Sequence, residues 1–326
     1  MQHFYRFQES KIAAMYADRL QEIAPFRVME LMERAKLLES RGERVVHFEV
    51  GEPDFATAPS VIAAGQRALA DGHTKYTQAL GLPELRARIA DYYLDKDLIE
   101  KALKPLRNGQ DYYRMETVMK RWGLQLVANN RTRTILGILQ SIPEETLLRH
   151  TWLAFFYGLL ATDTSPRHTL PYFETCRTQF AQNNDEAGEL MSLSQIIYFH
   201  FVISGRYHLG SMLLQRTQTL FERNHQDLPV EITIIVARNL AAGYCFFEGK
   251  MEQAQYYAKL GYELAKKRES GNFIAATRFI LGYIALLSGD RRSATHEIEY
   301  SLYLASNPLV GMSNRLTLHI MQLCEL

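Results

Sequence analysis

The chain has 326 residues, 47% of them hydrophobic and 22% charged, which is the composition of a globular protein rather than a disordered or fibrous one. Its 37 lysine and arginine residues balance 36 aspartate and glutamate residues, so no net charge draws the whole molecule to nucleic acid or to an acidic membrane. The longest apolar run, about 152–161, is roughly half a membrane span, and the first twenty residues show no signal-peptide core. We therefore expect a protein without a membrane span, located in the cytoplasm.

The three cysteines, Cys176, Cys245 and Cys324, are far apart and form no CxxC pair. This spacing argues against a disulfide framework and against a cysteine-based zinc site. We expect reduced thiols, as in the cytoplasm, with Cys176 and Cys245 packed as small apolar side chains in helices.

The first part of the chain, residues 1–95, mixes helix and strand signals. Apolar residues at helical spacing predict a helix over 26–40, ended by Gly42. Prolines in the first turn predict further helices over 59–70 and 83–94. The alternating apolar residues of 44–50 predict one short strand. This part is expected to be a small α/β domain.

The second part, residues 96–326, is predicted to be helical throughout. Three loop glycines, Gly205, Gly249 and Gly289, each follow an apolar helix and precede another one. The residues five and nine positions after each glycine are small or apolar: Gly210 and Leu214, Ala254 and Ala258, Ala294 and Ile298. A repeat of about forty residues is typical of stacked helical hairpins, in which glycine allows a sharp turn and a small residue allows close helix crossing. An irregular helical bundle is the alternative.

The first part resembles a known enzyme family. The strings IAPFRVMELMERAKLLESRG, HFEVGEPDF and KYTQALGLPELRARIADYY are similar to the N-terminal segment of class I/II (fold type I) pyridoxal-phosphate aminotransferases. The resemblance implies that Gly51 lies beside a substrate carboxylate. It also implies that Tyr76 reaches the phosphate of pyridoxal phosphate, typically in the neighbouring subunit.

The rest of that enzyme is not found after about Leu94. No glycine-rich phosphate-binding turn, no aspartate for the pyridine nitrogen and no Ser-x-x-Lys string follows, and the downstream lysines lie on solvent-facing helical patterns. We therefore predict no catalytic residue and no cofactor. The alternative is a pyridoxal-phosphate aminotransferase, or a remnant of one, that requires a missing catalytic domain.

The second part resembles the helical-repeat region of MalT-like, LuxR-family transcriptional regulators, a relative of tetratricopeptide repeats. The resemblance is carried by the segment 98–160 and by the string LGYIALLSGDRRSA. It implies a superhelix of helical hairpins with a concave binding surface. Such regulators also contain an ATPase and a DNA-binding domain. Because no GxxxxGK[ST] string occurs and the chain ends within the repeats, we expect no direct DNA binding.

The other residues that could form a site are more simply explained by structural roles. Glu52 and Asp54 flank Pro53 and could serve as an acid–base pair, but a surface turn is the simpler interpretation. His200 and His208 could approach each other across a hairpin, but no further ligand stands at zinc spacing, so no metal is expected. Aromatic residues gather on the repeat helices, most of them predicted to lie in the core: Tyr198, Phe199, Phe201, Tyr244, Phe246, Phe247, Tyr256, Tyr257 and Tyr283.

The chain is thus predicted to be mainly α-helical, a tetratricopeptide-like superhelix preceded by an aminotransferase-like fragment. The preferred function is a non-catalytic module that binds a protein, a peptide or a small effector along the concave repeat surface, where an exposed Tyr–Arg face would be the binding site. A natural fusion, a decayed gene and an assembly artefact all remain open as origins of the combination.

Overall fold

The computed structural model describes residues 27–319 except 49, 52, 54, 130, 308–309, 311–313 and 316–317. The described residues are mostly helical, which confirms the prediction of a mainly α protein. They divide into two compact units between Tyr76 and Thr77. The sequence-based division at 95/96 concerns family resemblance rather than packing, and it stays a prediction.

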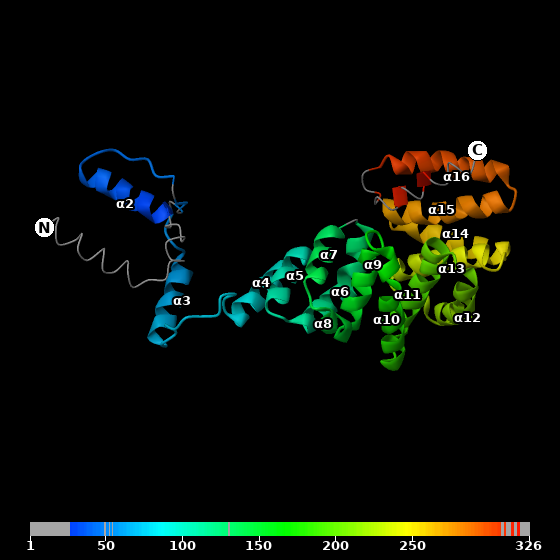
Figure 1. The fold of residues 1–326 in the computed structure, drawn as a ribbon, viewed down its shortest axis with the longest axis horizontal. Coiled ribbons are helices and arrows are strands. Elements are labelled where there is room, and N and C mark those ends of the chain that lie inside the picture. Colours follow the sequence, from blue (N-terminus) through cyan, green and yellow to red (C-terminus); the bar gives the residue numbers. More distant parts are fainter. Residues whose placement is uncertain are drawn as a thin grey trace, which may run out of the picture. The chain divides into compact units, whose positions relative to one another are not determined.

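The first unit contains helices α2 (Arg27–Ser40) and α3 (Pro59–Ala70), which match the two predicted helices closely (Figure 1). Gly42 ends α2 with φ +85°, a backbone conformation that glycine adopts without strain. Within this unit α2 buries Ala35, and α3 buries no residue.

The predicted strand over 44–50 is wrong. Residues 43–48 and 50 have no strand conformation, and no strand occurs elsewhere in the described part of the chain. A strand is stable only when its backbone groups pair with a neighbouring strand, and the apolar side chains here have no sheet to pack on. Val46 and Phe48 are accordingly exposed. For the residues described, the N-terminal segment is therefore helix and coil rather than α/β.

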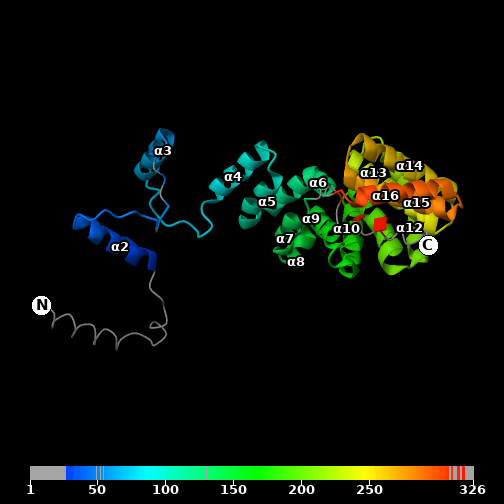
Figure 2. The same ribbon diagram turned by 90° about the horizontal axis from the view of Figure 1, so that it is seen from above.

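The second unit is a succession of helices joined by short loops (Figures 1 and 2). The helix predicted over 83–94 is α4, which spans Pro83–Asp95. The helices of the second unit are α4 (Pro83–Asp95), α5 (Ile99–Asn108), α6 (Tyr112–Ala128), α7 (Arg133–Gln140), α8 (Glu144–Arg149), α9 (Thr151–Ala161), α10 (Leu170–Gln182), α11 (Glu186–Tyr198), α12 (Tyr207–Asn224), α13 (Val230–Phe246), α14 (Met251–Lys267), α15 (Gly271–Leu287) and α16 (Arg291–Ala305). A 3₁₀ turn, η2 (Pro166–His168), precedes α10, and a π-helical turn, η3 (Phe199–Ser204), extends α11.

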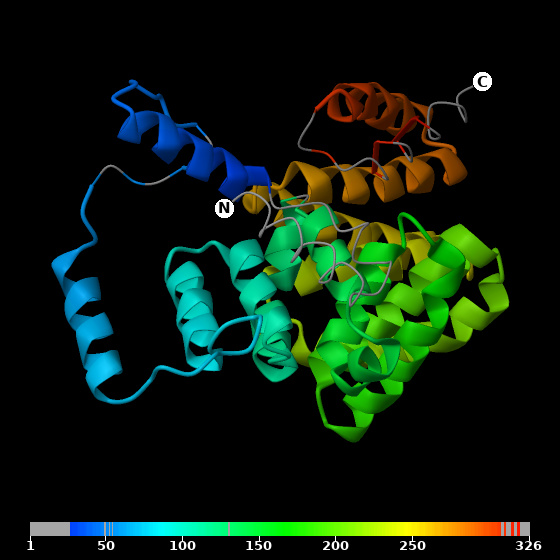
Figure 3. The ribbon, with the colours of Figure 1, turned by 60° about the vertical axis from the view of Figure 1, so that its left-hand side comes forward.

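The last six helices pack as three hairpins, α11–α12, α13–α14 and α15–α16. Figure 3 shows the third hairpin, coloured orange to red, with its two helices side by side. The first helices of the hairpins, α11, α13 and α15, also pack on one another. They bury more of their residues than α12 and α14 do: α13 buries 14 of its 17 residues, whereas α14 buries five of its 17. Each hairpin therefore needs its neighbours to bury its apolar surface.

The loop glycines behave as the spacing predicts. Gly205, Gly249 and Gly289 have φ of +63°, +65° and +75°. Both marked positions of each copy are buried: Gly210, Leu214, Ala254, Ala258, Ala294 and Ile298. Glycine at the loop and a small residue five positions later thus mark the hairpin turn and the close helix crossing.

Gly210 differs from the alanines at the equivalent positions for a local reason. A Cβ built there would lie 2.6 Å from Cζ of Phe247, so this ring already fills the space that alanine occupies in the other two copies. Phe247 follows α13 directly and packs on Tyr207, with the two ring centres 5.4 Å apart. The first hairpin therefore uses an aromatic ring from the second hairpin as its filler.

A polar cluster connects α11 to the preceding helices. Asp185 caps α11 by accepting a hydrogen bond from Gly188 N, and its Oδ2 accepts hydrogen bonds from Lys120 Nζ at 2.8 Å and Trp152 Nε1 at 2.9 Å. Burial alone would raise the pKa of Asp185, but these three hydrogen bonds outweigh burial and hold the pKa below its usual range.

No helix in the described ranges is both long enough and apolar enough to cross a membrane. The two buried cysteines that the structure describes, Cys176 and Cys245, are 0% and 3% exposed, which confirms their prediction as core side chains. Cys324 lies outside the described residues.

Candidate functional site

The two residues that the family resemblance assigns to cofactor and substrate stand in exposed coil. Tyr76 is fully exposed, and a Cβ added to Gly51 would meet no atom within 4 Å. The structure brings no described side chain into contact with either residue, so both assignments stay predictions. Glu52 and Asp54, the possible carboxylate pair, lie outside the described residues.

The described residues do not form a site that fits pyridoxal phosphate. The amine that binds this cofactor must be shielded and made nucleophilic by its surroundings. Every described lysine, from Lys36 to Lys267, is exposed.

A groove of about 930 Å³ lies between α10, α11–η3 and α12. We call it the basic groove. Its lining residues come from five consecutive elements, η2 to α12, and from Arg206 directly before α12: Arg167, Leu170, Glu174, Arg177, Thr178, Ile196, Phe199, His200, Ile203, Ser204, Arg206, Leu209, Met212 and Leu213. Seven of these side chains are aliphatic or aromatic, so the groove combines an apolar floor with a charged rim.

The π-helical turn shapes one wall of the basic groove. Widening from an α-helix to a π-helix changes the angular spacing of side chains, and such turns occur often at functional sites. His200 Nδ1 lies 2.9 Å from Ser204 Oγ, and the same hydroxyl accepts a hydrogen bond from Arg206 N at 3.2 Å. Together with Gly205 in the left-handed conformation, these contacts fix the turn that places Arg206 at the groove.

Three arginines line the basic groove: Arg167 from η2, Arg177 from α10 and Arg206 from the start of α12. No described carboxylate lies within 4.0 Å of any of their guanidinium groups. Glu174 is the one acidic residue in the lining. The groove therefore has an excess of positive charge that is not used for internal ion pairs.

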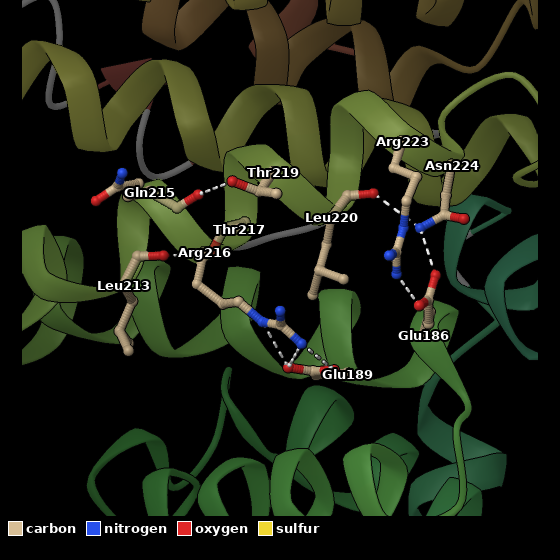
Figure 4. A network of polar contacts seen from close by, with 10 residues as sticks. All are labelled: Glu186, Glu189, Leu213, Gln215, Arg216, Thr217, Thr219, Leu220, Arg223 and Asn224. Atoms are coloured by element: carbon tan, nitrogen blue, oxygen red, sulfur yellow. Dashed lines mark hydrogen bonds and ion pairs between the residues drawn. The ribbon is translucent and has the colours of Figure 1, made fainter.

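Arginines on the adjacent surface of α12 are used differently (Figure 4). Arg216 donates hydrogen bonds to Glu189 of α11, which is almost fully buried, through Nε at 3.1 Å and Nη2 at 3.0 Å. Arg223 pairs with Glu186, and Asn224 Nδ2 also donates to Glu186, at 2.7 Å. These pairs hold α12 against α11, so their charges are compensated within the fold.

His200 is 5% exposed at the base of the groove. Burial, together with the positive charges of Arg206 and His208, lowers the pKa of His200. At neutral pH it is therefore an uncharged hydrogen-bonding group. Within the described ranges no three His, Cys, Asp or Glu residues gather closely enough to hold a metal ion.

The repeat aromatics pack largely as expected. Phe199, Tyr244 and Tyr257 are at most 7% exposed, whereas Tyr256 is 63% exposed. Phe201 stacks on Phe246 with ring centres 4.4 Å apart. These rings serve mainly to join successive hairpins.

Sequence reasoning missed the groove arginines. Arg167 and Arg177 have the sequence context of ordinary surface residues. Only the packing of α10 on α11 and of η2 on η3 brings them near Arg206. No local pattern could have identified this cluster.

Part of this chain is similar to aminotransferases. It is 42% identical over 82 residues to the (5-formylfuran-3-yl)methyl phosphate transaminase of Methanocaldococcus jannaschii, a match covering 25% of this chain and 22% of the relative. It is 38% identical over 84 residues to a probable aspartate/prephenate aminotransferase of Aquifex aeolicus, covering 26% of this chain and 21% of the relative.

The aspartate aminotransferase of Pyrococcus horikoshii is 42% identical over 77 residues, which cover 24% of this chain and 19% of the relative. No family model matches the chain. The chain thus contains an aminotransferase-like segment, and it spans only about a fifth to a third of the length of these curated relatives.

Proposed function

We propose that the helical unit is a tetratricopeptide-like interaction module that binds an acidic peptide segment of a partner protein in the basic groove. The observation that carries the proposal is the presence of three arginines without carboxylate partners around an apolar floor. The proposal refines the expected partner class, a protein or peptide, and moves its site from the concave surface in general to one groove.

The charge of the groove favours an acidic occupant. Arginine presents a rigid fork of donors that matches carboxylate geometry, and each of the three arginines lies in or directly beside a helical element. An acidic segment would pair with Arg167, Arg177 and Arg206 and leave Glu174 at the edge. A basic segment would place like charges together, which disfavours binding.

The floor of the groove favours a segment that also carries apolar side chains. Met212 is 77% exposed and lies beside half-buried aliphatic residues such as Ile203 and Leu213. Exposed methionine adapts well to varied partners. An amphipathic helix that alternates glutamate and leucine at helical spacing would satisfy both the rim and the floor.

The first experiment measures binding by fluorescence anisotropy with the full chain. A labelled amphipathic peptide of glutamate and leucine is compared with the same peptide carrying lysine in place of glutamate. We expect only the acidic peptide to bind, and its affinity should fall as the salt concentration rises, because rim charges are screened.

Variants locate the site. Arg177→Glu and Arg206→Glu should weaken binding of the acidic peptide at least tenfold. Arg133→Glu is the matched control, since Arg133 is also exposed and makes no ion pair with a described residue, and it lies on α7, outside the groove lining. Equal losses in all three variants, or tighter binding of a single-stranded oligonucleotide than of the acidic peptide, would refute the proposal.

The aminotransferase relatives favour a second candidate function. In this alternative the N-terminal segment contributes Gly51 and Tyr76 to a pyridoxal-phosphate site whose remaining parts come from another chain. The test is a titration of the purified protein with pyridoxal phosphate, followed by borohydride. A new absorbance band and a trapped adduct would support the alternative, and their absence with the chain alone would restrict it to a mixed assembly.

A further inference from the structure

A second, smaller cavity lies on the other side of α11. Its volume is about 130 Å³, and it is lined by side chains from α6, α9, α11, α13 and α15. Four residues outside these helices complete the lining: Thr132, Thr162, Asp163 and Asn314. The basic groove takes Ile196 and Phe199 from α11–η3, whereas this cavity takes Gln195 and Tyr198. The two hollows therefore share a helix but no lining residue.

The amide of Gln195 has an unmet hydrogen bond in this cavity. Gln195 is 3% exposed, and its Nε2 has no hydrogen-bond partner among the residues described. A buried donor without an acceptor costs about 1–3 kcal/mol. Such a group in a native fold calls for an explanation, and a ligand that supplies an acceptor is one.

A positive charge lines the same cavity. Arg238 of α13 donates hydrogen bonds to Asn239 Oδ1 through Nε at 2.9 Å and Nη2 at 2.8 Å, and its guanidinium lies 5.0 Å from the centre of the Tyr198 ring. No carboxylate in the described part of the chain approaches it within 4.0 Å. Burial lowers the pKa of Arg238 and raises that of Tyr198, as expected in a site poorly accessible to water.

The guanidinium is held in place by neighbouring helices. Asn239, which accepts its hydrogen bonds, itself donates through Nδ2 to the backbone oxygen of Ser194 at 2.9 Å. Asn239 is 1% exposed. The charge of Arg238 is thus positioned by a buried amide that bridges α13 and α11. The carboxylate of Asp163 also lines the cavity, but it forms no ion pair with Arg238.

We propose that this cavity binds a small carboxylate, whose oxygens accept hydrogen bonds from Arg238 and from the amide of Gln195. A cavity of similar size in another protein holds benzene, so the ligand has on the order of six non-hydrogen atoms. The site is independent of the basic groove and would make the module a sensor of a small metabolite as well as a peptide binder.

The ligand test uses calorimetry and thermal unfolding of the full chain. The probes are sodium propionate, pyruvate and alanine, with propionamide as the neutral analogue, sodium phosphate as the other anion, and sodium chloride to equalise ionic strength. At least one carboxylate should bind and raise the unfolding temperature, whereas propionamide and chloride should not. Pyruvate and alanine distinguish an oxo acid from an amino acid.

Gln195→Met separates a ligand-binding role from a structural one. It keeps the side-chain volume but removes the unmet donor, so the unfolding temperature without ligand should stay the same or rise. Carboxylate binding should weaken at least tenfold. Arg238→Gln should also lose binding, and if it fails to fold, Gln195→Met still decides. Unchanged carboxylate binding in Gln195→Met, or binding of phosphate alone, would overturn the proposal.

Discussion

Gly210→Ala tests whether the ring of Phe247 explains the departure of the first hairpin from the small-residue pattern. A Cβ at position 210 would lie 2.6 Å from Phe247 Cζ, against about 3.5–4.0 Å for an ordinary carbon contact. Cε2 of the same ring would lie closer still, so the ring must retreat by more than about 1 Å. It is held on one side by Tyr207, so the retreat disturbs the contact between α12 and the end of α13.

The magnitude follows from two opposing effects. Forcing an extra carbon into a packed site costs about 1–3 kcal/mol. Replacing glycine by alanine inside a helix stabilises the helix by about 1 kcal/mol. We expect a net loss of about 1 kcal/mol in the free energy of unfolding, measured from the urea midpoint by circular dichroism.

Two variants make the result interpretable. Gly137→Ala, in an exposed helical position with no atom within 4 Å of the new Cβ, should stabilise the protein by about 1 kcal/mol. In a Phe247→Ala background, Gly210→Ala should also stabilise. If Gly210→Ala stabilises the parent protein as much as it does the Phe247→Ala protein, the ring does not exclude alanine and the explanation is wrong.

Three further predictions concern buried groups. Because the folded pKa of Asp185 lies below its unfolded value, its contribution to stability is present above about pH 4 and lost as the pH falls further. Asp185→Asn should therefore lower the urea midpoint at pH 7 and flatten its decline between pH 5 and pH 3. Burial raises the pKa of Cys176 to about 12 and that of Cys245 to about 11, so in a Cys324→Ser protein both thiols should react with Ellman's reagent only on unfolding. The side chain of Arg278 is 9% exposed and pairs with Glu297 at 2.9 Å. Arg278→Met should therefore lower the free energy of unfolding by about 3–5 kcal/mol. Adding Glu297→Gln should recover part of that loss, as urea unfolding of the single and double variants would show.

Local signals predicted the helix boundaries well. The helix predicted over 59–70 has these same bounds in the structure, and the helix predicted over 83–94 extends one residue further, to Asp95. Proline in a first turn and glycine after a last turn act through the backbone of a few adjacent residues, so a single sequence contains the whole signal.

The strand over 44–50 failed because strand formation depends on distant residues. Alternating apolar residues describe what a strand needs on its two faces, but the backbone partner must come from elsewhere. The sheet that the aminotransferase resemblance implies has no counterpart in the described residues. The same limit explains why Gly210 looked like an exception, since Phe247 lies 37 residues away in the chain.

The candidate sites were beyond the reach of sequence reasoning for a related reason. An exposed Tyr–Arg face was expected, and the pair Tyr198 and Arg238 does occur, but half-buried in a small cavity rather than along an open surface. Gln195 carried a weak signal, since it is a lone amide before the apolar pair Ile196 and Ile197. Its missing partner can be recognised only when the neighbouring helices are in place.

The packing of α11 explains how one short helix contributes side chains to both the basic groove and the small cavity. A helix that packs on neighbours all around presents its side chains in several directions, and α11 buries ten of its thirteen residues. The π-helical turn that follows changes the side-chain spacing, so His200 and Ser204 reach the basic groove, whereas Tyr198, at the last α-helical position, still faces the small cavity. A helical wheel with a constant period would misplace one set or the other. Substitutions at the two sites can therefore be made separately, and a variant that abolishes binding at one site should leave the other intact as long as this turn is preserved.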